Sequence, residues 1–136
     1  MTTQTLSAPL PHSRSLIDLG LAVGLALPMI VFGLNKLIGF ADVPPPEGEA
    51  AQRFLGTMFT TYLAPLVALT EIVGGALYLW RRTAFIGLLI LCPLMANIVA
   101  FHVAHAMPGN GIWLFSLLFF GVAMWKHRED FRGLVR

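Results

Sequence analysis

Four polar side chains interrupt long apolar runs of this sequence, and each is of a type that can bind a ligand or move a proton. Glu71 lies within T-E-I-V-G-G, Lys36 within G-L-N-K-L-I, and Asn97 and His102 within N-I-V-A-F-H. A carboxylate, an ammonium, an amide and an imidazole together can donate and accept hydrogen bonds and exchange protons. An ionisable group in lipid costs roughly 2.5–3.5 kcal/mol on insertion scales, so such residues indicate pairing or function.

The depth of these groups follows from the helical rise of about 1.5 Å per residue. Glu71 lies about 15 Å from the arginine pair that ends its apolar run, which is near the middle of a bilayer. Asn97 lies about 20 Å and His102 close to 30 Å from the same boundary, and Lys36 lies about 30 Å from the start of the first run. The four groups are therefore predicted to meet in the outer half of a helical bundle, with Glu71 deepest.

Lys36 is the cation that can pair with Glu71 on this side. Two interpretations are open: a structural pair that only orders the bundle, and a pair that exchanges protons or binds a ligand. Asn97 alone is typical of an interhelical hydrogen bond worth about 1 kcal/mol or less. His102 and His105 together are also compatible with an interfacial pair that faces outer solvent.

A metal site is the weaker alternative for the histidine segment. His102, His105 and Met107 form H-x-x-H-x-M, whose imidazole and thioether groups suit copper. The spacing is loose, and no cysteine or carboxylate completes the set, so no metal is expected. A bis-histidine haem needs ligands from facing helices, and one run supplies both outer histidines, so neither haem nor a covalently bound cofactor is expected.

The composition indicates a membrane protein. The chain has 136 residues, of which 57% are hydrophobic and 12% charged, whereas soluble domains carry about 25% charged residues. This length allows one small domain. The net charge of +2, without a basic cluster, does not indicate a nucleic-acid partner, so none is expected, and the lipid bilayer is the expected surroundings. The single cysteine, Cys92, excludes an intramolecular disulfide.

The apolar runs predict an all-α protein, a four-helix transmembrane bundle. The predicted spans are residues 16–38, 62–80, 83–104 and 111–126. This membrane domain, residues 16–126, is expected between a flexible cytoplasmic tail, residues 1–15, and a basic cytoplasmic tail, residues 127–136. In the outer loop between the first two spans, a short interfacial helix is predicted by the helical spacing of Ala51, Phe54, Leu55 and Met58.

Arginine and lysine give the orientation. Positive charge recurs on one side of the four predicted spans, at Arg14, Arg81, Arg82, Lys126, Arg128, Arg132 and Arg136. By the positive-inside rule that side is cytoplasmic, so both termini are predicted to face inward.

Glycine and proline mark expected contacts and bends. Gly20 and Gly24 form G-x-x-x-G, a spacing that lets helices approach closely. Pro28 and Pro93 are expected to kink the first and third spans.

In their order and spacing, four short motifs resemble the DoxX family of small bacterial membrane proteins. They are F-G-L-N-K-L-I-G-F, T-E-I-V-G-G-A-L-Y-L, W-R-R-T-A and N-I-V-A-F-H. The resemblance implies a four-helix bundle in the bacterial inner membrane and a link to thiosulfate:quinone oxidoreduction or oxidative-stress complexes. It also implies, by position, that Lys36, Glu71 and His102 are functional. Arg82 and the proline-rich outer loop depart from the pattern and leave the substrate open.

Two functions therefore remain as hypotheses. The first is a quinone-linked component of a membrane oxidoreductase or oxidative-stress complex, with a partner protein as the electron donor. The second is a non-catalytic anchor or assembly subunit. Either function implies a protein partner or a homo-oligomer, and whether the chain is an enzyme stays open.

Overall fold

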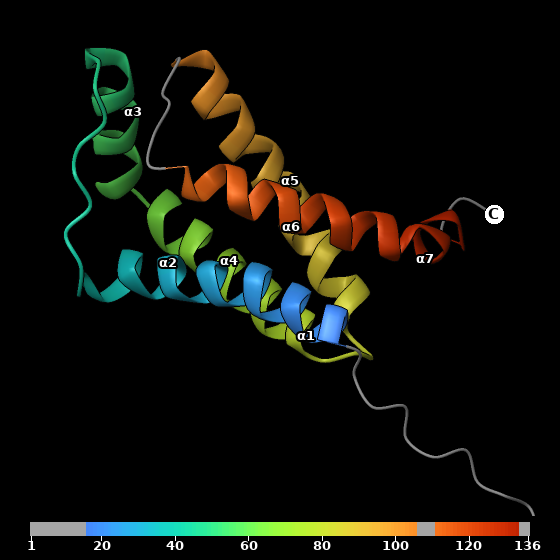
Figure 1. Cartoon of the computed structure of the whole chain (residues 1–136). Coiled ribbons are helices and arrows are strands. Elements are labelled where there is room, and N and C mark those ends of the chain that lie inside the picture. Colours follow the sequence, from blue (N-terminus) through green and yellow to red (C-terminus); the bar gives the residue numbers. More distant parts are fainter. Residues whose placement is uncertain (1–15, 106–110, 134–136) are drawn as a thin grey trace, which may run out of the picture.

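Helices make up all the regular structure in the described part of the chain, which in this computed structural model is residues 16–105 and 111–133 (Figure 1). No strand occurs in these two ranges. The elements in chain order are α1 (Leu16–Leu21), the π-helical turn η1 (Ala22–Ala26), α2 (Leu27–Ile38), α3 (Glu49–Phe59), α4 (Leu63–Leu79), α5 (Ala84–Ala104), α6 (Ile112–Lys126) and α7 (Arg128–Gly133). The prediction of an all-α protein is confirmed.

Two helical runs are long and apolar enough to cross a membrane. They are Leu16–Ile38, with 23 residues, and Ala84–Ala104, with 21. There is a third candidate span if α3 and α4, which meet at a bend of 81°, are counted as one. α6 is also apolar but has only 15 residues, which cover about 22 Å at a rise of about 1.5 Å per residue. The chain is therefore a membrane protein by length and composition of its helices.

The first span widens just before its proline. α1, η1 and α2 follow one another without a break, and the π-helical turn of η1 ends two residues before Pro28. Pro28 has no N–H for the carbonyl of Gly24, so the preceding turn loses a normal helical hydrogen bond. Pro28 was expected to kink this helix, and the feature that the structure shows there is the π-helical turn of η1. α5 continues through Pro93 from Ala84 to Ala104.

α4 packs against both α2 and α5, and α6 packs against η1 and α5 (Figure 1). The largest fully buried side chains lie where these helices meet, at Leu25, Leu88, Leu91 and Met95. Outward faces carry large apolar side chains such as Leu66, Leu69 and Leu118, each more than half exposed. Such surfaces suit contact with lipid.

Small residues set the closest helix contacts. A Cβ on Gly87 of α5 would lie 2.6 Å from both the Gly74 carbonyl oxygen and the Tyr78 backbone nitrogen of α4. Only glycine permits this approach. In the predicted G-x-x-x-G, Gly24 faces the Phe119 ring, whereas Gly20 faces open space, so one of the two glycines makes a helix contact.

The predicted outer-loop helix is present as α3, which lies across the end of the bundle in Figure 1. Ala51 and Met58 are buried, and the Phe54 ring packs on Phe101 of α5 at 5.3 Å between centroids. Because α3 bends by 81° from α4, it runs across the direction in which α4 would cross a bilayer.

Part of the predicted basic tail, residues 127–136, is helical. Residues 128–133 form α7, whose Phe131 packs edge-on against Phe85 of α5 at 4.6 Å. An aromatic side chain in an otherwise charged segment explains this docking. The predicted flexible tail, residues 1–15, lies outside the described residues, as do residues 134–136.

Candidate functional site

Lys36 and Glu71, which the sequence places on different helices, form an ion pair. Lys36 lies in the last turn of α2 and Glu71 in the middle of α4. The Lys36 ammonium Nζ donates to both carboxylate oxygens of Glu71, at 2.8 Å to Oε1 and 2.7 Å to Oε2. The side chain of Glu71 is 4% exposed and that of Lys36 is 19% exposed. The Glu71 side chain is therefore enclosed, while the Lys36 side chain is partly exposed.

Gly33 brings the two helices together at the pair. It lies one turn before Lys36, and a Cβ at this position would be 2.8 Å from the Ala68 carbonyl oxygen and 2.7 Å from Ile72 Cγ1. The same Cβ would lie 3.1 Å from Glu71 Cβ. Since any larger residue would push α2 from α4, Gly33 sets the short distance that the ion pair needs.

Asn35 fixes the end of α2 beside the pair, a role that the sequence pattern alone did not reveal. Its side-chain amide donates to the Ala41 carbonyl at 3.0 Å, and its Oδ1 accepts from the Ala41 N–H at 2.8 Å. Gly39 caps the helix with φ of 61°, which favours glycine. The signal for this clamp is N-K-L-I-G, an asparagine one turn before a glycine that ends a helix.

The Lys36 ammonium retains binding capacity. It has three N–H donors, and Glu71 takes two of them. The Phe32 ring, one turn earlier on α2, lies with its centroid 5.9 Å from Nζ. An apolar ring beside a charged donor is a suitable surface for a flat, polar-edged ligand.

Asn97 is not brought to this pair. It is exposed on the outward face of α5, and no hydrogen bond joins its amide to another group in the described ranges. The predicted meeting of four polar groups therefore reduces to two groups in direct contact. The cause is the rotation of α5 about its axis, which the sequence pattern did not determine because this helix is apolar on every side.

His102 belongs to a separate aromatic cluster. Its Nδ1 lies 2.8 Å from the Ile98 carbonyl oxygen, and its ring stacks on Trp113 of α6 at 4.5 Å and 21°. Phe101 packs on Phe54 of α3 and on His105. This cluster joins α3, α5 and α6.

The metal alternative gains no support from the described residues. Within residues 16–105 and 111–133, no group of three histidine, cysteine, aspartate or glutamate side chains could hold a metal ion. His102 and His105 each contact the Phe101 ring, and Met107 lies outside the described residues.

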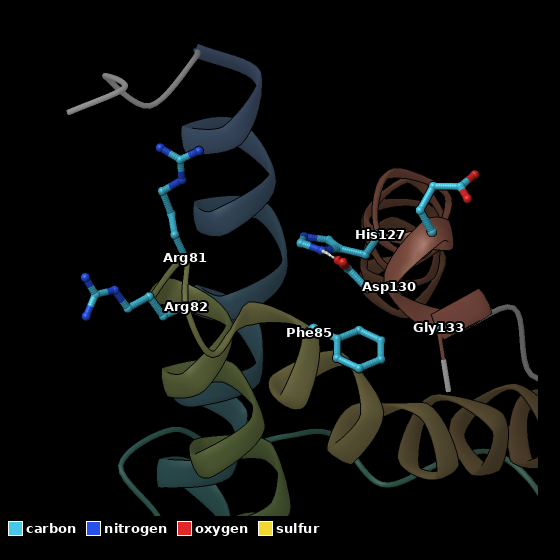
Figure 2. A pocket seen from close by; sticks show the side chains of 7 residues that line it. Arg81, Arg82, Phe85, His127, Asp130 and Gly133 are labelled. Atoms are coloured by element: carbon cyan, nitrogen blue, oxygen red, sulfur yellow. Dashed lines mark hydrogen bonds and ion pairs between the residues drawn. The ribbon is translucent and has the colours of Figure 1, made fainter. Parts of the chain in front are cut away.

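An open cavity of ≈ 530 Å³ lies at the opposite end of the bundle from the ion pair. It is lined by Arg81, Arg82, Phe85, His127, Glu129, Asp130 and Gly133. Figure 2 shows the two arginine side chains extending away from His127 and Asp130, which hydrogen-bond to each other at 2.8 Å. The polar groups that line this cavity do not converge on one point, so the Lys36–Glu71 pair remains the better candidate site.

Comparison with known proteins gives one distant relative to report. The chain is 25% identical over 119 residues to the uncharacterized protein YwoB of Bacillus subtilis, covering 82% of this chain and 77% of that protein. No protein-family model matches the sequence. No solved structure matches it either. This similarity names no activity.

Proposed function

We propose that this chain is a DoxX-like inner-membrane protein that crosses the bilayer four times, with both termini in the cytoplasm. Two observations support it: the helices lie in the ranges expected for spans, and the cavity brings Arg81 and Arg82 to the same end as His127. In a variant with Cys92→Ala, an impermeant maleimide should label Glu47→Cys in intact cells and Arg82→Cys only after permeabilisation. Labelling of both in intact cells would contradict the orientation.

The function proposed for this protein is that of a quinone-linked component of a membrane oxidoreductase or oxidative-stress complex. The observation that carries it is the partly exposed side chain of Lys36, whose ammonium is paired with the buried Glu71 carboxylate and lies beside the Phe32 ring. A quinone is a flat apolar ring with carbonyl oxygens, and it would bind as a substrate with one carbonyl at the third N–H of Lys36.

The pair would also favour reduction of this quinone. Reduction to quinol takes two electrons, which a partner protein would supply, and two protons, which would come from solvent water. Negative charge grows on the carbonyl oxygens as electrons arrive, and a fixed ammonium beside one of them stabilises that charge. Glu71 holds the ammonium in place, so its role is to position Lys36. Because His102 lies in the aromatic cluster, any proton exchange by His102 would be separate from the Lys36–Glu71 pair.

Photolabelling locates the quinone most directly. An azido-quinone added to the full-length protein in nanodiscs should, on illumination, attach to α2 or α4 near Phe32 and Lys36, and excess natural quinone should suppress it. Peptide mass spectrometry identifies the labelled segment. Label confined to α6, or spread evenly over all the helices, would contradict the proposal.

A second function, a non-catalytic anchor or assembly subunit, is favoured by one specific observation. Both oxygens of Glu71 are bonded to Lys36, and Gly33 packs tightly beside them, as a purely structural pair would require. The variant Glu71→Gln distinguishes the two functions. If it reaches wild-type levels in the membrane and binds its partner, yet loses quinone binding, the anchor function alone is excluded. If the variant loses quinone binding only because it fails to accumulate in the membrane, the anchor function is supported.

A further inference from the structure

The outward face of α5 carries a polar residue at a depth where lipid surrounds the helix. α5 has 21 residues, and Asn97 lies about 20 Å from its first residue and about 10 Å from its last. The amide is exposed on the surface of the bundle, without a hydrogen-bond partner among the described residues. The hydrocarbon core offers no water to satisfy it, so an amide here favours a protein partner.

The residues around Asn97 form one continuous stripe. The exposed residues of α5 include, at spacings of three or four, Ile86, Leu89, Pro93, Asn97, Ala100 and Ala104. This spacing keeps side chains on one side of a helix and is the pattern of a helix–helix seam. Toward the outer end the stripe consists of Asn97 with two alanines, which allow a second helix to approach closely.

Among the described residues, the outward faces of α4 and α6 lack this combination of an amide and small residues. α4 presents Leu66, Leu69 and Val73 to its surroundings, and α6 presents Leu118 and Val122. These large side chains suit lipid. The amide and the small residues therefore single out α5 as a face that another helix covers.

Hydrogen-bond complementarity indicates a second copy of the same chain as the occupant. An asparagine amide is both donor and acceptor, so two such amides can bond reciprocally. A two-fold axis along the membrane normal places both Asn97 residues at the same depth, whereas an unrelated helix would need its own polar group at that level. We propose that two copies pair in the membrane through this face of α5, with their Asn97 amides hydrogen-bonded to each other.

Disulfide cross-linking in native membranes tests the pairing. In full-length protein with Cys92→Ala, Ala100→Cys and Ala104→Cys should each give a dimer band on oxidation, at least tenfold stronger than Leu69→Cys or Leu118→Cys on the outward faces of α4 and α6. Equal bands at all four positions, or no dimer band, would overturn the proposal. An adduct of another mass would show a different protein on this face and would overturn it as well.

A second experiment tests the amide itself. Energy transfer between labelled copies in lipid vesicles should show that Asn97→Leu raises the dissociation constant about 3- to 30-fold, the effect of losing one or two membrane hydrogen bonds. Asn97→Gln keeps an amide and should retain most of the affinity. If Asn97→Leu associates as tightly as wild type, Asn97 is not at the centre of an interface. These results do not depend on quinone binding at Lys36.

Discussion

Two lysine–carboxylate pairs join different helices, and they differ in their surroundings. Lys36 and Glu71 join α2 to α4 with a carboxylate that is 4% exposed. Asp18 of α1 and Lys126 of α6 also form an ion pair, but the Asp18 side chain is 23% exposed and that of Lys126 is 40% exposed. Asp18 lies about 27 Å from Lys36 along the first helical run. The same chemistry thus occurs once enclosed between packed helices and once at a rim.

The difference shows what enclosure adds to an ion pair. A rim pair exchanges its partner for water or lipid headgroups at little cost, so it contributes little beyond local order. An enclosed pair must stay complete, because loss of one partner leaves the other charge without compensation. Only the enclosed pair combines a fixed geometry with a remaining N–H donor, which is why it is the candidate site.

The largest effect is expected from breaking the enclosed pair on one side. Lys36→Met leaves the Glu71 carboxylate buried without its cation, and the free energy of unfolding should fall by about 3–5 kcal/mol. Unfolding by SDS titration of the purified protein measures it. Adding Glu71→Leu as a second change should restore most of the loss, because two apolar side chains need no charge partner.

The loss of unfolding free energy in Lys36→Met shows how well the Lys36–Glu71 pair is enclosed. A loss below about 1 kcal/mol for Lys36→Met would mean that Glu71 reaches water or another cation, and the two pairs would then be alike.

A smaller effect is expected from separating the helices without touching the charges. Gly33→Ala places a Cβ against the Ala68 carbonyl and should lower the free energy of unfolding by about 1–3 kcal/mol. Gly20→Ala is the matched control on the same helical run, since its Cβ meets open space. The control should be neutral or stabilising by up to about 1 kcal/mol. Equal losses in both variants would show that Gly33 does not set the distance between α2 and α4.

The smallest effect is expected at the rim pair. Asp18→Asn should change the free energy of unfolding by less than about 1 kcal/mol, because solvent screens a partner as exposed as Lys126. The same SDS titration provides the comparison. A loss as large as that of Lys36→Met would contradict the distinction between the two pairs.

The sequence predicted the helices well because their apolar runs and breaks are long and clear. The four predicted spans and the outer-loop helix all correspond to helices, and Lys36 was predicted as the partner of Glu71 by charge and depth. Helix rotation was not predictable where a helix is apolar all round. Asn97 was therefore expected near the pair, yet it faces outward on α5.

Contacts between segments far apart in the sequence were also not predictable. The stacking of His102 on Trp113 and the docking of Phe131 on Phe85 depend on how α6 and α7 cross α5, which no local pattern encodes. The clamp of Asn35 on Ala41 is local, and a helix-ending glycine after an asparagine was its available signal.

The measurement that tests the central claim most directly is the amount of quinone bound by a protein that folds without its ion pair. The variant Lys36→Met with Glu71→Leu is purified in nanodiscs beside the wild type, and extracted quinone is quantified by mass spectrometry. We predict about one quinone per chain in the wild type and at least a tenfold loss in the variant, at comparable yield and with most of the wild-type stability. Equal quinone in both proteins, or none in the wild type, would contradict a quinone site at Lys36 and Glu71.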